Sequence, residues 1–560
     1  MYNKNTTLFL TLENLKKANF PVFKFKKDDY LKSILDLKRS GIKNGIEWYF
    51  GAIKVKEIII VPTDQSYKYL QNFLVTFCII FFWKNISIFV DNGRLQRVKF
   101  QDMLTSIFNV IYHFYRIWFF KKNVSRVLKK YPVKPKKIPC LNEGDLIYYY
   151  KTNYQFGVKA GGSIGHISGV INSLALDFDV KVFSVDTLAS INKNIDISIL
   201  DYENISYTYP FHLNSLALSF HFIAEFEERV SKERPALIYQ RLTLFNFSGA
   251  YISNKYNVPF VVEYNGSEAW IQSNWGRGLK DNDLAIEIED YVLKSADLVV
   301  TVSDVLEKEL LKRGVNKNKI VTYPNCIDPL KYDHLKHKLQ RHEVREKLNI
   351  GLDSFVLTYV GTFGAWHGVD FLADSIKYLV ENYKEILDIN KVQFLLIGDG
   401  LLGNTVREKL SHERYEKYVK FTGIVPQDIT PDYLFISDVF LSPHGQQKGD
   451  FIGSPTKIFE YMAYSKPIIA SRLGQIDDLF ESRIHATELH QENYEINDQS
   501  AIIFEPGNMR QFCDSVLSVV GSKKYEIVGK NSYDLVMKKY TWSNHVEKIV
   551  NKYVELSECN

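Results

Sequence analysis

The sequence predicts an α/β fold of two Rossmann-like lobes of parallel sheet that face a cleft, preceded by a basic N-terminal extension. The length of 560 residues exceeds one ordinary core and suits three or four units. The composition, with 46% apolar and 14% aromatic residues, is typical of a folded protein. Short apolar strands alternate with helical stretches in two separate runs, which is typical of parallel sheets covered on both faces.

Residues 1–140 form the basic extension. They carry 26 Lys and Arg against 9 Asp and Glu, whereas the remaining residues carry 44 against 56. Strands are expected at 57–63 and 86–91. The apolar run 69–83 between them is too short to span a bilayer, so we expect a buried helix in a small α/β unit. The lysines are scattered among apolar residues and match no recognised module, so no nucleic-acid partner is expected.

The stretch 106–130 of this extension is aromatic and ends in a cluster of Lys and Arg. Two interpretations stay open. The helix lies flat in an anionic membrane interface, or it packs on the core with a solvated end. The Pro- and Lys-rich residues 131–139 are typical of a linker.

The five cysteines form no CxxC pair, which favours a reducing compartment without disulfides or structural zinc. The N-terminus shows no cleavable signal peptide. We therefore expect a cytoplasmic protein, with a peripheral position on the inner face of the cytoplasmic membrane if 106–130 contacts lipid.

The first run of alternating elements predicts an N-terminal lobe over 141–335, and the second predicts a C-terminal lobe over 336–535. Strands of the first lobe are "DLIYYY", "VKVFSVD", "ALIYQR", "PFVVEYN" and "ADLVVTVS". Strands of the second are "SFVLTYVGT", "VQFLLIGDG", "VKFTGIV", "DVFLSPH", "KPIIAS" and "AIIFEP".

The stretch "GSPTKIFE" (453–460) contains the start of a helix, a cation and a carboxylate. Ser454 is a good N-cap residue and Pro455 suits the first helical position. The free N–H groups of a helix start favour a phosphate, to which Lys457 adds a full charge. Glu460 lies three residues further on the same helix face, where a carboxylate can accept the two hydrogen bonds of a ribose diol. The pattern suits a nucleoside diphosphate, although an ordinary capped helix with a Lys–Glu pair would also explain it.

Seven motifs in order give the chain a resemblance to the family 4 glycosyltransferases, retaining enzymes of the two-lobed GT-B fold. They are "SPTKIFEYMAYSKPIIAS", "KAGGSIGHISGVINSL", "YQRLTLFNFSGAYISNKYNVPFVVEYN", "ADLVVTVSDVLEKEL" with "IVTYPNCIDP", "YVGTFGAWHGVDFLADSI", "FLLIGDG" and "FEPGN". The resemblance covers about 145–550 and leaves residues 1–140 outside it. It implies that the terminal helix, 536–560, crosses back to the N-terminal lobe.

The resemblance implies the residues of the site. The catalytic set is Lys457, Glu460 and His166. The donor nucleotide and phosphates are expected at Gly162, Gly361, Thr362, Gly364, His367, Gly453, Ser454, Lys457 and Glu460. The donor sugar and acceptor are expected at His444, Asn265 and Arg241. For His166 a buried helix-start histidine is the rival interpretation, and for Arg241 a structural salt bridge.

The chain departs from the family pattern at four positions. The first of the two usual glutamates is replaced by Ile452, and Asp450 is the nearest substitute. The usual phosphate-binding Arg and Lys are replaced by Thr362 and His367. Asn265 stands where many relatives have a catalytic histidine. We expect Lys457 and the backbone of Gly361–Gly364 to bind part of the diphosphate instead.

The implied reaction transfers a hexosyl group, with retention, from a nucleoside-diphosphate sugar to a hydroxyl. No DxD motif lies at a C-lobe strand end, so no obligatory metal and no cofactor besides the donor substrate are expected. The acceptor is expected to be a glycan or lipid-linked glycan of surface polysaccharide synthesis. Two alternatives remain: a catalytically inactive scaffold of a membrane glycan-assembly complex, and a nucleotide-sugar epimerase.

Overall fold

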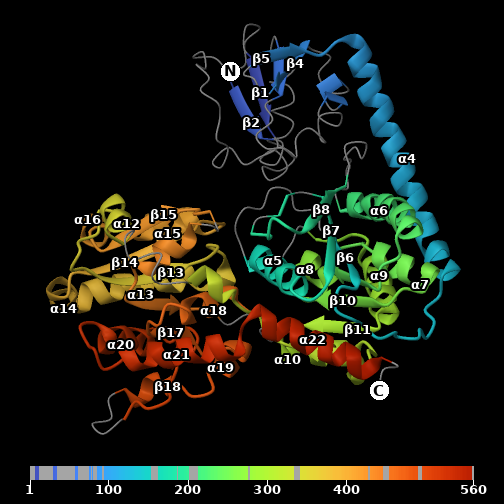
Figure 1. Cartoon of the computed structure of the whole chain (residues 1–560). Helices are drawn as coiled ribbons and strands as arrows, with labels where there is room; N and C mark the ends of the chain where they lie inside the picture. Colours follow the sequence, from blue (N-terminus) through green and yellow to red (C-terminus); the bar gives the residue numbers. More distant parts are fainter. Residues whose placement is uncertain are drawn as a thin grey trace.

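A computed structural model describes the chain in segments. They are residues 7–11, 30–33, 57–60, 75–76, 78–79, 85–90, 94–152, 162–185, 187–188, 190–200, 212–274, 278–332, 341–426, 429–445, 453–489 and 495–557. Within these residues no helix is long and apolar enough to cross a membrane. Three separate sheets organise the chain, and the larger two contain seven strands each (Figure 1).

The N-terminal extension contains a five-stranded sheet of order β2-β1-β3-β4-β5, parallel except for the β4–β5 pair. The strands expected at 57–63 and 86–91 are present as β3 and β4. Most of the apolar segment 69–83 lies outside the described residues. The bounds are β1 (Thr7–Thr11), β2 (Tyr30–Ser33), β3 (Glu57–Ile60), β4 (Asn85–Val90) and β5 (Arg94–Arg97).

A single 31-residue helix, α4 (Phe100–Lys130), leads from this sheet to the N-terminal lobe and runs beside α6 (Leu213–Lys232) (Figure 1). The segment 131–139 that follows does not behave as a free linker. The Lys136 ammonium is almost fully buried, lies 3.1 Å from an Asp297 carboxylate oxygen and donates to the Ser295 carbonyl. This buried ion pair attaches the segment to the lobe.

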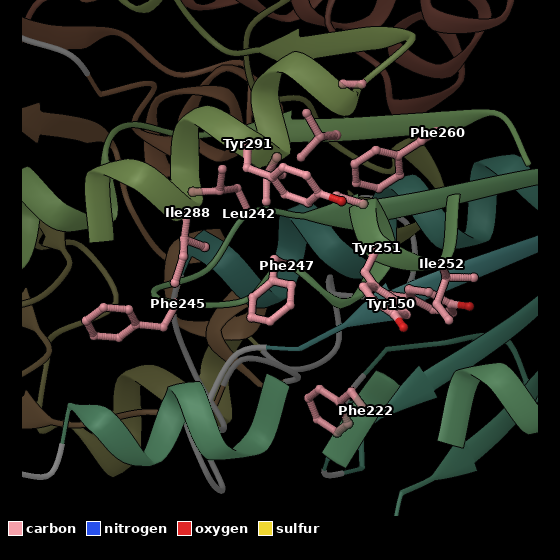
Figure 2. Close-up of a cluster of buried hydrophobic side chains, with 14 of the residues drawn as sticks. Tyr150, Phe222, Leu242, Phe245, Phe247, Tyr251, Ile252, Phe260, Ile288 and Tyr291 are labelled. Atoms are coloured by element: carbon pink, nitrogen blue, oxygen red, sulfur yellow. The ribbon is translucent and has the colours of Figure 1, made fainter. Parts of the chain in front are cut away.

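The N-terminal lobe is an all-parallel sheet of order β12-β11-β10-β9-β6-β7-β8 with helices on both faces. Aromatic and branched side chains fill the interface between the strands and one helical layer, as Figure 2 shows for Tyr150, Phe222 and Phe260. The remaining bounds are β6 (Leu146–Lys151), α5 (Gly162–Leu174), β7 (Asp179–Ser184), β8 (Asp196–Ile199), β9 (Leu237–Arg241), α7 (Ser248–Tyr256), β10 (Phe260–Tyr264), α8 (Glu268–Asn274), α9 (Asn282–Ser295), β11 (Leu298–Thr301), α10 (Asp304–Lys312) and β12 (Ile320–Thr322).

The C-terminal lobe is a second all-parallel sheet, of order β15-β14-β13-β16-β17-β19-β18. Its bounds are α12 (Arg341–Lys347), β13 (Phe355–Val360), α13 (Val369–Asn382), α14 (Lys384–Ile389), β14 (Val392–Ile397), α15 (Gly403–Lys409), α16 (Glu413–Glu416), β15 (Val419–Gly423), α17 (Thr430–Phe435), β16 (Val439–Ser442), α18 (Thr456–Met462), β17 (Ile468–Ser471), α19 (Gly474–Leu479), β18 (Ile484–His485), β19 (Ile502–Phe504), α20 (Met509–Val519) and α21 (Glu526–Lys539). The predicted fold class, two Rossmann-like lobes, is confirmed.

The last helix, α22 (Trp542–Leu556), leaves the C-terminal lobe and packs against α5 of the N-terminal lobe. Gly169 makes this contact close, because a Cβ there would overlap the Trp542 ring. The chain thus passes between the lobes twice. The two passages are joined where Ile327 donates to the Tyr540 carbonyl and Trp542 donates to the Ile327 carbonyl, each at 3.0 Å.

The cysteines correct one expectation. Cys140 is disulfide-bonded, and its partner lies outside the described residues. Cys78, Cys326 and Cys513 are free, as the sequence suggested for all five, and they are buried. The prediction of a chain without disulfides is therefore wrong at Cys140.

Candidate active site between the two lobes

The order of strands points to one region of each lobe. In both sheets the chain starts at a central strand, β6 or β13, adds strands on one side and then returns to the other. Ligands of such sheets bind outside the carboxyl ends of the strands at this switch point. In the C-terminal lobe the switch point lies between β13 and β16, which end at Val360 and Ser442. Of the predicted residues, Gly361, Thr362, Gly364 and His367 follow β13, and His444 follows β16.

The loops after β13 and β16 bring His367 and His444 together. His367 Nδ1 lies 3.4 Å from His444 Nε2, and His444 Nδ1 lies 2.9 Å from the Ser442 hydroxyl. Burial and the nearby Lys457 charge lower the pKa of His367 to about 2 and that of His444 well below its usual value. Both imidazoles are therefore neutral, so His367 carries no charge that could replace the lysine of the family pattern.

Gly368 fixes the approach of these loops. It precedes α13 with φ +69°, and a Cβ there would overlap the Pro443 carbonyl oxygen. The free N–H groups at the start of α13, a 14-residue helix, lie at the switch point and favour an anion.

We expect Gly368→Ala to disrupt the loop before His444, because the new methyl group overlaps a backbone atom and the left-handed conformation adds about 1–2 kcal/mol of strain. Thermal unfolding and nucleoside-diphosphate binding measure the effect. Gly423→Ala is a matched control, with φ +70° and open space around the Cβ. If both variants lose the same stability and both keep binding, the contact with Pro443 has no role.

Lys457 is the cation of the donor region. Its side chain starts from α18, and Nζ lies 4.4 Å from the centre of the Tyr359 ring and close to Gly361, where a Cβ would be 3.1 Å from it. Nζ is buried and has no hydrogen-bond partner among the described residues. Burial lowers the pKa of Lys457 to about 7, against the opposing charge of Glu460. An ammonium held in this way can bind an anion that enters the site.

Thr362, another predicted donor residue, contacts the Tyr359 side chain over which Lys457 lies. The Tyr359 hydroxyl donates to the Thr362 carbonyl at 3.1 Å, and the Gly364 N–H donates to the same carbonyl at 2.9 Å. Glu460 is half-buried on α18, and its charge acts on both Lys457 and Lys331. Ile452 and Asp450 lie outside the described residues, so the position of the missing glutamate has no structural description.

The structure corrects the predicted start of α18. The helix begins at Thr456 with Pro455 in the cap position, and Ser454 makes no capping hydrogen bond. Instead the Ser454 hydroxyl accepts from the Asn325 N–H at 2.9 Å, and its carbonyl accepts from the Asn325 side chain. Gly453 immediately precedes it. Ser454 therefore connects the donor loop of one lobe to the end of the other.

A buried polar network continues from Asn325 into the N-terminal lobe. Asn325 Oδ1 lies 2.5 Å from His166 Nδ1, and His166 Nε2 lies 2.9 Å from a Glu263 carboxylate oxygen. Glu263 also pairs with Arg241 at 3.1 Å and accepts from the Asn265 amide. Three predicted residues, His166, Arg241 and Asn265, are thus gathered around a fourth, Glu263, that the sequence analysis did not single out.

Charge keeps Glu263 ionised. Burial alone would raise its pKa, but the charges of His166 and Arg241 and two hydrogen bonds lower the pKa to about 2. His166 is only 2% exposed and both of its ring nitrogens contact protein acceptors. This geometry favours the buried-histidine interpretation, and it makes His166 a positioning residue of the interlobe contact. Gly162, at the start of the same helix, packs against Thr456 of the other lobe.

Glu268 is a second residue that the sequence analysis missed. It begins α8, three residues after Asn265, and burial raises its pKa to about 7 despite the nearby charge of Arg241. A carboxyl group that is half protonated near neutral pH can exchange a proton. The sequence "YNGSE", which places Glu268 just after the end of a predicted strand, could have indicated this residue.

A polar cavity of about 510 Å³ in the C-terminal lobe belongs to a different region. It lies at the amino ends of β13 and β14, and Lys391 and Asp438 line it. Arg345, at its wall, already donates to four backbone carbonyl groups. The cavity therefore lies at the edge of the sheet opposite to the carboxyl ends of the strands, where ligands of such sheets bind.

The two seven-stranded parallel sheets define the class of this molecule: a two-lobed α/β protein with the GT-B architecture. Residues 354–522 match the family described as Glycosyl transferases group 1, and residues 166–330 match the family described as Glycosyltransferase Family 4. The chain belongs to this family of glycosyltransferases, and the predicted family is confirmed.

Named relatives are distant. The chain is 24% identical over 238 residues to a putative teichuronic acid biosynthesis glycosyltransferase, TuaC, of Bacillus subtilis, covering 42% of this chain and 53% of TuaC. It is 23% identical over 244 residues to an Escherichia coli UDP-Gal:alpha-D-GlcNAc-diphosphoundecaprenol alpha-1,3-galactosyltransferase, covering 43% and 56%. The chain thus spans little more than half the length of these two relatives.

Solved structures match over most of the chain. The Anabaena protein Alr3699/HepE in complex with UDP has a TM-score of 0.51 and 17% identity, covering 73% of this chain and all of that one. WaaG, a glycosyltransferase involved in lipopolysaccharide biosynthesis, has a TM-score of 0.50 and 12% identity, covering 74% and 100%. At these identities the likeness shows the fold alone.

Proposed function

We propose that the chain transfers a hexosyl group, with retention, from a nucleoside-diphosphate sugar to a hydroxyl of a glycan or lipid-linked glycan in surface polysaccharide synthesis. The observation that carries the proposal is Lys457, a buried ammonium without a hydrogen-bond partner among the described residues, at the switch point of the C-terminal lobe. A diphosphate supplies the missing partner. The distant relatives named for teichuronic acid and for a UDP-galactose donor support the substrate class.

In the proposed complex the diphosphate lies against Lys457, the Gly361–Gly364 backbone and the start of α13, and the ribose lies on Glu460. The bond between the anomeric carbon and the diphosphate oxygen breaks, and the acceptor oxygen bonds to that carbon from the same face. The acceptor proton passes to the leaving diphosphate. The protein then contributes positioning and stabilisation of the diphosphate charge, and His444 and the N-lobe residues Arg241 and Asn265 orient the sugar and the acceptor.

The acceptor is proposed to be membrane-borne, and the chain is proposed to work at the inner face of the cytoplasmic membrane. The galactosyltransferase relative, whose name gives a diphosphoundecaprenol-linked acceptor, supports this. The basic charge of residues 1–140 points the same way.

The test is nucleoside-diphosphate release from a panel of nucleotide sugars, with and without crude membrane lipid. We expect one donor to be turned over by the wild type and the rate to fall at least 100-fold in Glu460→Ala, because the ribose loses its carboxylate partner. Glu416→Ala, an exposed carboxylate of α16, is the control and keeps the rate.

Other results would replace the proposal. Donor binding without release on any lipid would identify an inactive scaffold. A changed sugar with no acceptor present would identify an epimerase. Equal activity of Glu460→Ala and the wild type would place the nucleotide elsewhere.

A further inference from the structure

The long helix α4 has two apolar faces, although a surface helix normally needs one. One face is buried against the protein. Its side chains recur at helical spacing and are at most 7% exposed: Val110, Ile117, Val124 and Leu128.

The opposite face is also apolar and lies in solvent. Five large side chains, spaced three or four residues apart, project from one side of the helix and are 52–66% exposed. We call them the α4 stripe; they are Leu104, Phe108, Ile111, Tyr115 and Trp118. A contiguous exposed apolar patch of this kind marks a contact with a protein partner or a membrane.

The same line along the helix continues in basic residues. Continuing from Trp118 at steps of three or four residues gives Lys122, Arg126 and Lys129, and all three are exposed. Lys122 Nζ lies 4.2 Å from the centre of the Trp118 ring. The helix contains six Lys and Arg and one acidic residue, Asp102 near its start. The surface is therefore aromatic at one end and strongly positive at the other.

The orientation of the stripe is fixed relative to the N-terminal lobe. Phe120 stacks on Phe220 of α6 with ring centres 4.3 Å apart, Lys121 pairs with Asp281, and the Ser125 hydroxyl donates to Glu287. These contacts fix the buried side of α4 on the N-terminal lobe. A partner that binds the α4 stripe therefore has a defined orientation relative to that lobe.

We propose that the α4 stripe and its basic continuation bind the surface of an anionic lipid bilayer. Aromatic and aliphatic side chains enter the interface while Lys122, Arg126 and Lys129 meet the headgroups. Charge favours the bilayer over a second copy of the chain. A second copy would place one positive surface against another, whereas anionic lipid has the complementary charge. That the bound membrane also holds the acceptor rests on the proposed function, but lipid binding itself does not.

The test is co-sedimentation of the full chain with vesicles of phosphatidylcholine alone or with about one third phosphatidylglycerol. We expect binding only to the anionic vesicles, weakened by salt. Each basic residue contributes about fivefold to the affinity for anionic vesicles. The triple variant Lys122→Glu/Arg126→Glu/Lys129→Glu should therefore lower this affinity at least 100-fold. Phe108→Ser/Tyr115→Ser/Trp118→Ser lowers it similarly. Leu352→Ser/Ile389→Ser, which removes two exposed apolar side chains of the C-terminal lobe, leaves it unchanged.

A direct readout comes from Trp118. Brominated phosphatidylcholine in the anionic vesicles quenches tryptophan emission, and Trp118→Phe should lose most of this quenching while keeping binding. Nucleoside-diphosphate binding without vesicles confirms that each variant is folded and tests the donor site separately. Equal vesicle binding by the wild type and the stripe variant overturns the proposal. So does a dimer in solution that the stripe variant abolishes, combined with no vesicle binding, since the occupant is then a second copy.

Discussion

Replacement of Lys457 by methionine is expected to abolish donor binding and, at the same time, to stabilise the free protein. The ammonium is buried, and burial lowers its pKa from 10.5 to about 7, so the folded state is penalised for holding the charge. Exchanging buried charge for an apolar side chain of similar length often raises stability by about 1–4 kcal/mol. A stabilising effect of the substitution would show that the buried charge of Lys457 serves ligand binding at the expense of stability.

The pH dependence follows from the same pKa. The diphosphate needs charged Lys457, which the free protein holds below pH 7 and loses above it. Donor affinity should therefore be constant below about pH 7 and fall about tenfold per pH unit above it, until the raised pKa of the complex is reached. Unfolding stability shows the opposite slope, because the unfolded lysine keeps its proton to about pH 10.5. Stability of the wild type thus rises with pH between these values, and Lys457→Met lacks the rise.

Calorimetric titration of nucleoside diphosphate between pH 6 and 9 and denaturant unfolding of both proteins measure these effects. Lys384→Met, an exposed lysine of α14, is the control and changes neither quantity. Donor binding by Lys457→Met at wild-type affinity would contradict the assignment of the diphosphate to this ammonium.

Replacement of Glu263 by glutamine is expected to lower both the stability and the donor affinity. Glu263 is fully buried and pairs with the Arg241 guanidinium, so its removal leaves that largely buried charge without its carboxylate partner, at about 3–5 kcal/mol. Because His166 then loses one of its two contacts, the chain of contacts through Asn325 to Ser454 loosens, and the donor loop loses its support.

Acid unfolding gives an independent signature of Glu263. Its folded pKa of about 2 lies below the unfolded value of 4.5, so the stabilisation is complete above pH 4.5 and lost as the pH falls to about 2. The wild type should lose about 3 kcal/mol through this group alone over that window. Glu263→Gln should lack this part of the slope.

Glu289→Gln is the matched control for the positioning role. Glu289 is also buried, pairs with Arg313 at 2.8 Å and accepts from the Ser267 hydroxyl, but it has no link to Asn325. It should lose comparable stability while retaining donor affinity. If both variants lose donor affinity in proportion to stability, the interlobe network has no specific effect on the donor.

The sequence was sufficient for the fold because the signal is local: buried parallel strands such as β6 and β13 appear as short apolar runs bounded by helices. It also placed His367 and His444 in the loops that follow strands and Lys457 in the first turn of a helix, because each motif shows which local element a residue belongs to. The sequence did not show how these side chains are arranged relative to one another. His367 and His444 are 77 positions apart, and only the pairing of β13 with β16 makes them neighbours.

The interlobe network was missed for a related reason. Glu263 lies inside a strand and Asn325 in a loop, and nothing in their local sequence shows that His166 joins them across 159 positions. Ser454 illustrates a different error. Its residue type favours a helix cap, but its hydroxyl accepts a hydrogen bond from the Asn325 N–H and makes a tertiary contact instead. Local preference predicted the residue's chemistry but not its partner.

The paired passage at Ile327 and Thr541 has a mechanical consequence. Two independent connections would allow the lobes more freedom to move, whereas two chain passages hydrogen-bonded to each other act as one joint. We therefore expect substrate-driven closure of the lobes to be a rotation about this joint. Because α22 continues from this joint onto α5, the helix that carries His166 is attached directly to the joint.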